Sequence, residues 1–404
     1  MEDGFYTKIS EMEPTMPVDP SGVLEDLAIE VIRKSAGISA SVHPVTRRGI
    51  VELVRKMNSY YSNLIEGHNT HPVDIDRAMR EDFSIDPARR AKQMESKAHI
   101  EVQKCIEARI EDSPGTVITS ESFLCWIHKE FYERMPDEYL VVQRADGRAE
   151  KVIPGKTREV EVEVGRHLPP KPEYLCDFMK RFEEVYDPQK LKGLNQVIAA
   201  ASSHHRLAWI HPFLDGNGRV TRLMTHAYLK KAKIDGHGLW TVSRGFARNR
   251  EEYLACLAEA DQPRGGDLDG RGNLTQAGLL RFCKFFLETA VDQIDFMSGL
   301  LGLDGMQKRI QAVVDRQVSF GALKPEAGHL LRDVFLRGEI PRGEIPGIIG
   351  MPERSSRRVV RGLLEKGYLV SDSEKGPVML GFPASMVGYY FPRLYPEGVE
   401  TSLE

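Results

Sequence analysis

The feature that most constrains this chain is an interruption between two helical segments at residues 210–222. Pro212 lacks a backbone N–H, and the run Gly216-Asn217-Gly218 favours a turn, so a continuous helix through this stretch is excluded. Apolar residues recur at helical spacing on both sides, at Leu194, Val197, Ile198, Ala201 and Leu207, and then at Val220, Leu223, Met224, Ala227 and Tyr228. The sequence therefore predicts two helices joined by a tight loop that opens directly into the second helix.

The loop gathers residue types that bind phosphate. A glycine-rich turn that opens a helix presents backbone N–H groups and the positive end of the helix dipole, so residues 216–218 form a candidate anion site. Arg219 and Arg222 are three apart and add positive charge to one side of this helix. Asp215 is a hard oxygen ligand beside the anion site, as a magnesium ion that bridges phosphates requires. His211, at the entrance of the loop, is a candidate general base.

Taken singly, these features have ordinary structural explanations. A Gly-Asn-Gly turn before a helix is at least as often only a turn, and a His-Pro pair is more often structural. Their combination within one short segment is what indicates a phosphate-handling site. Residues 211–222 resemble the signature of the Fic family, His-Pro-Phe-x-(Asp/Glu)-Gly-Asn-Gly-Arg-x-x-Arg, and match it at every specified position.

This resemblance implies a protein adenylyltransferase, which moves AMP from ATP to a Ser, Thr or Tyr hydroxyl of a target protein or of itself. It implies His211 as the catalytic base, Asp215 as the ligand of Mg²⁺, and ATP as substrate. The nucleotide-binding residues that it implies in the loop are Gly216, Asn217, Gly218, Arg219 and Arg222. Phe213 is expected to anchor the loop in the core.

Composition is that of an ordinary globular protein. With 404 residues, 41% hydrophobic and 28% charged, the chain is expected to form two or three domains. A net charge of −4 argues against a protein that coats nucleic acid, although it permits a local basic patch. The scattered cysteines lack CxxC spacing, as is typical of reduced thiols in a cytoplasmic protein. We expect no secretory signal and no membrane partner, because no apolar stretch approaches the ~20 residues that span a bilayer.

The expected fold class is mostly α: a Fic-type helical core with a β-hairpin flap and a small winged helix-turn-helix domain. The expected domains are an N-terminal helical region at 1–112, a catalytic core at 113–298, a winged helix-turn-helix domain at 321–382 and a tail at 383–404. An irregular arm is expected over 1–20, and helices over 22–36, 46–66, 73–110, 191–209, 243–260 and 275–298, with one more capped by Thr119 or Ser120.

The helix expected at 46–67 ends in a glutamate whose role the spacing leaves open. Ser62 and Glu66 share one face at its C-terminal end, and Gly67 suits the left-handed residue that closes a helix. On spacing alone, a solvated surface glutamate is the simpler interpretation. The fragment 62–67 resembles the inhibitory pattern of Fic proteins, (Ser/Thr)-x-x-x-Glu-(Gly/Asn), which implies that Glu66 pairs with Arg222 in the place of the ATP γ-phosphate. An arginine held by a carboxylate cannot also grip phosphate bidentately, so self-inhibition is expected.

Between 152 and 168 the apolar period changes to two. Val160, Val162 and Val164 alternate with glutamates after a Pro154-Gly155 turn, which predicts a β-hairpin. Such a hairpin is either decorative or, as the resemblance implies, a flap that aligns the target segment by strand addition.

Other polar residues are expected to be structural or remain open. His128, His204 and His205 are expected in the core, since neighbours on a helix point about 100° apart and do not chelate together. Tyr253 is either a contact of the nucleotide ring or a core residue. Asp261 replaces an asparagine found in many Fic proteins, which leaves the base preference open.

The C-terminal region predicts three helices at 325–337, 342–349 and 353–366, followed by a strand–turn–strand wing at 368–380. The third helix carries Arg354, Arg357, Arg358, Arg361 and Lys366 against only Glu353 and Glu365. Such a helix suits phosphate contacts in a DNA groove, whereas winged helices also form homodimers or dock target proteins.

Two further functions stay open from the sequence. One is a hydrolase of AMP–protein bonds, in which Glu66 activates water instead of blocking the site. The other is a DNA-binding regulator whose Fic core only senses nucleotide.

Overall fold

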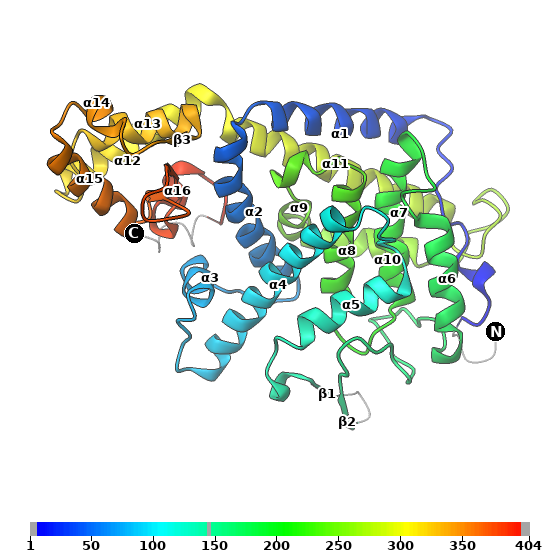
Figure 1. Ribbon diagram of the computed structural model, residues 1–404. Coiled ribbons are helices and arrows are strands. Elements are labelled where there is room, and N and C mark those ends of the chain that lie inside the picture. Colours follow the sequence, from blue (N-terminus) through cyan, green and yellow to red (C-terminus); the bar gives the residue numbers. More distant parts are fainter. Residues whose placement is uncertain (1–5, 144–146, 397–404) are drawn as a thin grey trace.

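The computed structural model describes residues 6–143 and 147–396, and these are mostly helical, as expected from the sequence (Figure 1). The ends of the predicted arm and tail, 1–5 and 397–404, lie outside the described residues. The N-terminal part comprises a short 3-10 helix at Ile9–Met12 and helices α1 Val23–Ala40, α2 Pro44–Ile65, α3 Pro72–Met79 and α4 Pro87–Asp112. Within the described residues, no helix is both long and apolar enough to cross a membrane.

The middle of the chain packs around the helix pair on either side of the predicted loop. Its helices are α5 Glu121–Tyr132, α6 Leu175–Tyr186, α7 Leu194–Ile210, α8 Asn217–Lys231, α9 Ser243–Arg248, α10 Arg250–Ala260 and α11 Gln276–Leu301. Both α7 and α8 are buried over most of their length, which makes them the central layer between α4, α5 and α11 (Figure 1). Ser120 is the N-cap of α5, where its hydroxyl accepts a hydrogen bond from the N–H of Phe123 at 3.2 Å.

Two predicted helices are each broken in the structure. The single helix expected over 73–110 is wrong, because Asp86 caps a new helix at Pro87 by accepting from the N–H of Arg89 at 2.7 Å. The helix expected over 243–260 is interrupted at Asn249, whose backbone is not helical (φ −113°, ψ 42°). Apolar periodicity continued through both breaks, so it could not locate them.

The β-hairpin lies earlier than predicted. Strands β1 Val141–Gln143 and β2 Ala149–Lys151 pair antiparallel, whereas the predicted hairpin at 152–168 contains only the bridge Val164–His167 among its described residues. The valines at 160 and 162 are less exposed than the glutamates that alternate with them, but alternation specifies only which side chains face inward. A ladder also requires a partner strand, and the segment instead meets the loop between α7 and α8, where the N–H of Arg158 donates to the carbonyl of Pro212.

The C-terminal module has the predicted three helices and wing, with an added strand. It contains helices α12 Leu303–Ser319, α13 Ala327–Arg337, α14 Ile345–Ile349 and α15 Glu353–Glu365, and strands β3 Glu339–Ile340, β4 Leu369–Val370 and β5 Val378–Leu380. The strands form one antiparallel sheet in the order β3-β5-β4. Helix α12 falls in a range to which the sequence assigned no element.

The tail folds onto α2 instead of extending from the wing. After α16, Val387–Tyr390, the chain passes α2, where the hydroxyl of Tyr61 donates to the carbonyl of Leu394 at 2.9 Å. The ring of Tyr395 lies edge-on to that of Tyr60, with centroids 5.2 Å apart. A cavity of about 670 Å³ separates α2 from the wing, and none of its lining residues belongs to the loop at 211–222.

Candidate active site

The loop between α7 and α8, residues 211–222 and hereafter the active loop, is fixed by contacts of its own side chains. His211 ends α7 in the left-handed conformation (φ 50°, ψ 60°). The amide of Asn217 closes the turn, since its oxygen accepts from the N–H of Phe213 at 2.9 Å and its nitrogen donates to the carbonyl of Phe213 at 2.7 Å. Phe213 is fully buried and stacks on His128 with centroids 4.2 Å apart. The predicted anchoring role of Phe213 and structural role of His128 are therefore confirmed, and the Asn217 side chain fastens the loop.

The position and the protonation state of His211 suit a general base. Its Nδ1 lies 3.4 Å from the carbonyl oxygen of Ala208. In the tautomer that carries its proton on Nδ1 and donates to this carbonyl, Nε2 is unprotonated and can accept a proton. Burial, together with the nearby Arg158 and His167, lowers the pKa of His211 to about 4. The imidazole is therefore neutral near pH 7.

Arg158 is a loop contact that the sequence did not reveal. Its Nε donates to the carbonyl of His211 at 2.8 Å, and its backbone N–H donates to the carbonyl of Pro212 at 2.9 Å. The start of the segment that follows Arg158 is thereby fixed beside the entrance of the active loop.

The start of α8 has the backbone geometry that the predicted anion site requires. Gly216 is its N-cap in the left-handed conformation (φ 80°), and the N–H of Val220 is the first to bond back, to the carbonyl of Gly216. The preceding N–H groups of this first turn have no intrahelical acceptor. A Cβ on Gly218 would lie 2.4 Å from Oε1 of Glu66, so the carboxylate of Glu66 sits directly over the anion site.

Glu66 and Arg222 are in contact. Nη2 of Arg222 donates to Oε1 of Glu66 at 2.5 Å, and Nε donates to the hydroxyl of Ser62 at 2.9 Å. The arginine side chain is only 2% exposed and that of Glu66 is 34% exposed. Burial works to raise the pKa of Glu66, but Arg222 outweighs it and the pKa is lowered, so the pair is ionised.

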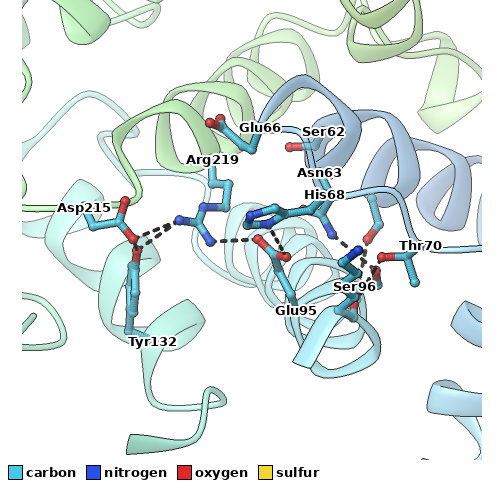
Figure 2. A network of polar contacts seen from close by, with 12 residues as sticks. Ser62, Asn63, Glu66, His68, Thr70, Glu95, Ser96, Tyr132, Asp215 and Arg219 are labelled. Atoms are coloured by element: carbon cyan, nitrogen blue, oxygen red, sulfur yellow. Dashed lines mark hydrogen bonds and ion pairs between the residues drawn. The ribbon is translucent and has the colours of Figure 1, made fainter. Parts of the chain in front are cut away.

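A second chain of contacts runs beside this pair (Figure 2). Nη2 of Arg219 donates to Oδ2 of Asp215 at 3.0 Å and to the hydroxyl of Tyr132 at 3.2 Å, while Nη1 donates to Oε1 of Glu95 at 2.8 Å. The Tyr132 hydroxyl also donates to Oδ2 of Asp215 at 2.5 Å. Oε2 of Glu95 lies 2.8 Å from Nδ1 of His68. Both Nη atoms of Arg219 thus have protein partners, whereas its buried Nε has none among the described residues.

Sequence reasoning missed Glu95, His68 and Tyr132. The signal that could have found Glu95 is the inner face of α4, where polar residues recur at helical spacing and are buried, at Gln93, Ser96, His99, Gln103 and Glu107. A buried polar stripe of this kind indicates a network of partners.

Asp215 fits a magnesium ion that is held jointly with a nucleotide. Although burial works to raise its pKa, Arg219 and the Tyr132 hydroxyl lower it, so the carboxylate is charged. The described residues contain no cluster of three or more His, Cys, Asp or Glu side chains that could hold a metal by itself. One carboxylate with phosphate oxygens and water is the donor set that Mg²⁺ commonly takes.

Tyr253 belongs to the core. It is 3% exposed, its hydroxyl lies 2.8 Å from Nε2 of His204, and its ring stacks on Phe246. This burial fits the core-packing interpretation of Tyr253, and the nucleotide contact stays a prediction. His204 and His205 are also buried, as predicted, and His205 pairs with Asp261 at 3.2 Å.

Comparisons with known proteins agree with this geometry. Residues 118–229 match the family model described as Fic/DOC family. A curated relative from Drosophila grimshawi, "Protein adenylyltransferase Fic", is 28% identical over 262 residues, which are 64% of this chain and 50% of that protein. The relative of the same name from Drosophila mojavensis is 28% identical over 142 residues, 34% of this chain and 28% of that one. The chain thus spans half or less of the length of these curated relatives.

Solved structures agree on the fold. A Fic family protein from Desulfovibrio desulfuricans G20 aligns with a TM-score of 0.52 at 16% identity, covering 90% of this chain and 98% of that one. Fic-1 from C. elegans, residues 134–508, aligns with a TM-score of 0.50 at 16% identity, covering 69% of this chain and 73% of that one.

Proposed function

Because residues 118–229, which contain the active loop, match the Fic/DOC family model, we propose that this chain is a protein adenylyltransferase held inactive by Glu66. The observation that carries the proposal is the active loop. It joins a neutral histidine to a helix N-terminus whose first N–H groups have no intrahelical acceptor. Arg222 lies about one turn further along α8. The proposed substrates are ATP and a protein hydroxyl of Ser, Thr or Tyr.

In the proposed reaction, Nε2 of His211 takes the proton of the target hydroxyl as its oxygen attacks the α-phosphorus of ATP. A P–O bond to the target forms, the bond from the α-phosphorus to the bridging oxygen breaks, and pyrophosphate leaves with the electron pair. The backbone N–H groups at the start of α8 and the guanidinium of Arg222 stabilise the phosphate charge. Asp215 would hold Mg²⁺, which neutralises phosphate charge when bound.

Glu66 opposes this reaction in the described conformation. Its carboxylate covers Gly218 and engages Arg222, so the place where a phosphate would bind carries a fixed negative charge. A nucleotide can still enter, but its terminal phosphate cannot pair with Arg222 until Glu66 leaves.

The function is tested by replacing the proposed base in a chain freed of its inhibitor. Glu66→Gly protein is incubated with ATP labelled at either the α or the γ phosphate, and we expect only the α label to be incorporated. His211→Asn in the same background should abolish incorporation. Asparagine tolerates the left-handed backbone of this position better than alanine, so the fold is preserved. An unchanged rate in His211→Asn would refute the assignment.

A hydrolase is the second candidate, and the position of Glu66 favours it. A carboxylate over the anion site, still 34% exposed, could activate water against an AMP–protein bond. Incubating an AMP-modified target without ATP separates the two, because only the hydrolase releases AMP, and Glu66→Gln should then abolish the release.

A DNA-binding regulator is the remaining alternative, and it rests on the exposed arginines of α15, namely Arg354, Arg357, Arg358 and Arg361. A duplex mobility shift that weakens with salt and is lost in the double variant Arg357→Glu, Arg358→Glu would support it. No shift at low salt would exclude it.

A further inference from the structure

The two arginines of the active loop have carboxylate partners of different kinds. Glu66 lies at the C-terminal end of α2 and its side chain is 34% exposed, so a small movement of the helix end releases Arg222. Glu95 lies inside the long helix α4 and its side chain is 5% exposed. No comparable movement can take it from Arg219. Arg222 therefore has a releasable partner, whereas Arg219 has a permanent one.

The permanent pairing controls how Arg219 meets Asp215. A guanidinium beside a carboxylate tends to form two parallel hydrogen bonds, one to each oxygen. Here Glu95 takes Nη1, and only Nη2 reaches Asp215. The Tyr132 hydroxyl and Arg219 both bind Oδ2 of Asp215 (Figure 2). These side-chain contacts gather on Oδ2, and the backbone of Gly216 also contacts the carboxylate. Oδ1 accepts no side-chain hydrogen bond from the described residues.

Glu95 is itself held from the other side. Its second oxygen lies 2.8 Å from Nδ1 of His68, and the N–H of His68 donates to the carbonyl of Asn63 at 2.9 Å. The hydrogen bond to Glu95 raises the pKa of His68, so a cation is favoured on that side as well. The Glu95 carboxylate is therefore fixed in orientation between two basic groups.

We propose that Glu95 is a positioning residue that acts through Arg219 on Asp215 and keeps Oδ1 of Asp215 available to the magnesium ion. This inference rests on the proposed transfer reaction, in which Asp215 holds that ion. Without Glu95, Arg219 swings to bind both oxygens of Asp215 and competes with the cation. Arg219 consequently serves the metal ligand, and Arg222 alone serves as the arginine for the terminal phosphate.

The test varies Glu95 in the Glu66→Gly background and measures, by calorimetry, the Mg²⁺ concentration that half-saturates binding of a non-hydrolysable ATP analogue. For Glu95→Ala we expect this concentration to rise on the order of tenfold, as for other losses of a residue that orients a metal ligand. Glu95→Gln keeps an acceptor oxygen for Nη1 and should restore most of the affinity. The control is Glu111→Gln on the same helix, whose side chain is 68% exposed and pairs with Lys230; it should change nothing.

An unchanged Mg²⁺ requirement in Glu95→Ala, with only a lower melting temperature, would overturn the proposal and leave Glu95 a purely structural residue. If the Glu66→Gly protein binds no nucleotide at all, the proposed function fails instead. The positioning role is then decided by a crystal structure of Glu95→Ala: Arg219 bound to both oxygens of Asp215 supports it, and Arg219 in its original pose refutes it.

Discussion

Replacing Glu66 by glycine should raise the rate of the proposed AMP transfer. The change removes the carboxylate that lies 2.5 Å from Nη2 of Arg222, while the contacts of that arginine with Ser62 remain. A hydrogen bond between charged groups contributes about 1.5–3 kcal/mol. The Glu66 side chain is 34% exposed to water, so the lower part of this range applies. Since about 1.4 kcal/mol is a factor of ten, the rate should rise on the order of tenfold or somewhat more.

The assay is intact mass after incubation with ATP and Mg²⁺, sampled over time for native protein and Glu66→Gly. An AMP-sized adduct that appears only, or much faster, in the variant is the expected result. Glu66→Gln serves as a graded control, because it keeps the shape but not the charge and should be intermediate. Equal rates of adduct formation in all three would refute the inhibitory role of Glu66 while leaving the transferase intact.

Three further results are expected. Because the pKa of His211 is lowered to about 4, the neutral base persists above that value, and the transfer rate of Glu66→Gly should fall only as pH drops through about 4; a half-point near 6.5 would contradict this. Burial, followed by the nearby Arg222, lowers the pKa of His99 to about 3. Its unfolded value is ~6.5, so the stability it contributes is complete above that pH and falls by about 2 kcal/mol by pH 5; urea unfolding should lose this slope in His99→Leu. Tyr395→Ala should lower the unfolding free energy by about 3 kcal/mol, with equal melting temperatures counting against the packing of the tail on α2.

The active loop could be predicted because its determinants are local. Pro212, the glycines and the arginines act within a few residues of one another, so their spacing reports their geometry. The Glu66–Arg222 contact was different. The spacing of Ser62 and Glu66 favoured a surface glutamate, and only the resemblance to an inhibitory pattern pointed to a buried partner.

The Glu95 network could not be predicted because its contacts are long-range. Arg219 and Glu95 are 124 residues apart in sequence, and nothing near either residue specifies the other. The inner face of α4 is polar and buried. Apolar periodicity identifies a buried face only when that face is apolar, so it could not identify the polar face that α4 buries.

The hairpin shows that a local sequence pattern also fails to identify the partner of a strand. The valines at 160–164 alternate with glutamates and predicted a hairpin there, but the paired strands are β1 and β2. Each of these strands has three residues, too few for an alternating pattern to be recognised.

The docking of the tail on α2 bears on how the protein is made. Tyr61 and Leu394 are 333 residues apart, so at roughly 5–20 residues per second the ribosome needs some tens of seconds to supply the second after the first. Throughout that interval Tyr60 and Tyr61 of α2 lack their contacts with Leu394 and Tyr395. A chain cleaved ahead of α16 would remain in that condition, with every residue of the active loop present and the helix bearing Glu66 less firmly seated. Proteolysis at this end is therefore expected to act as an irreversible means of activation.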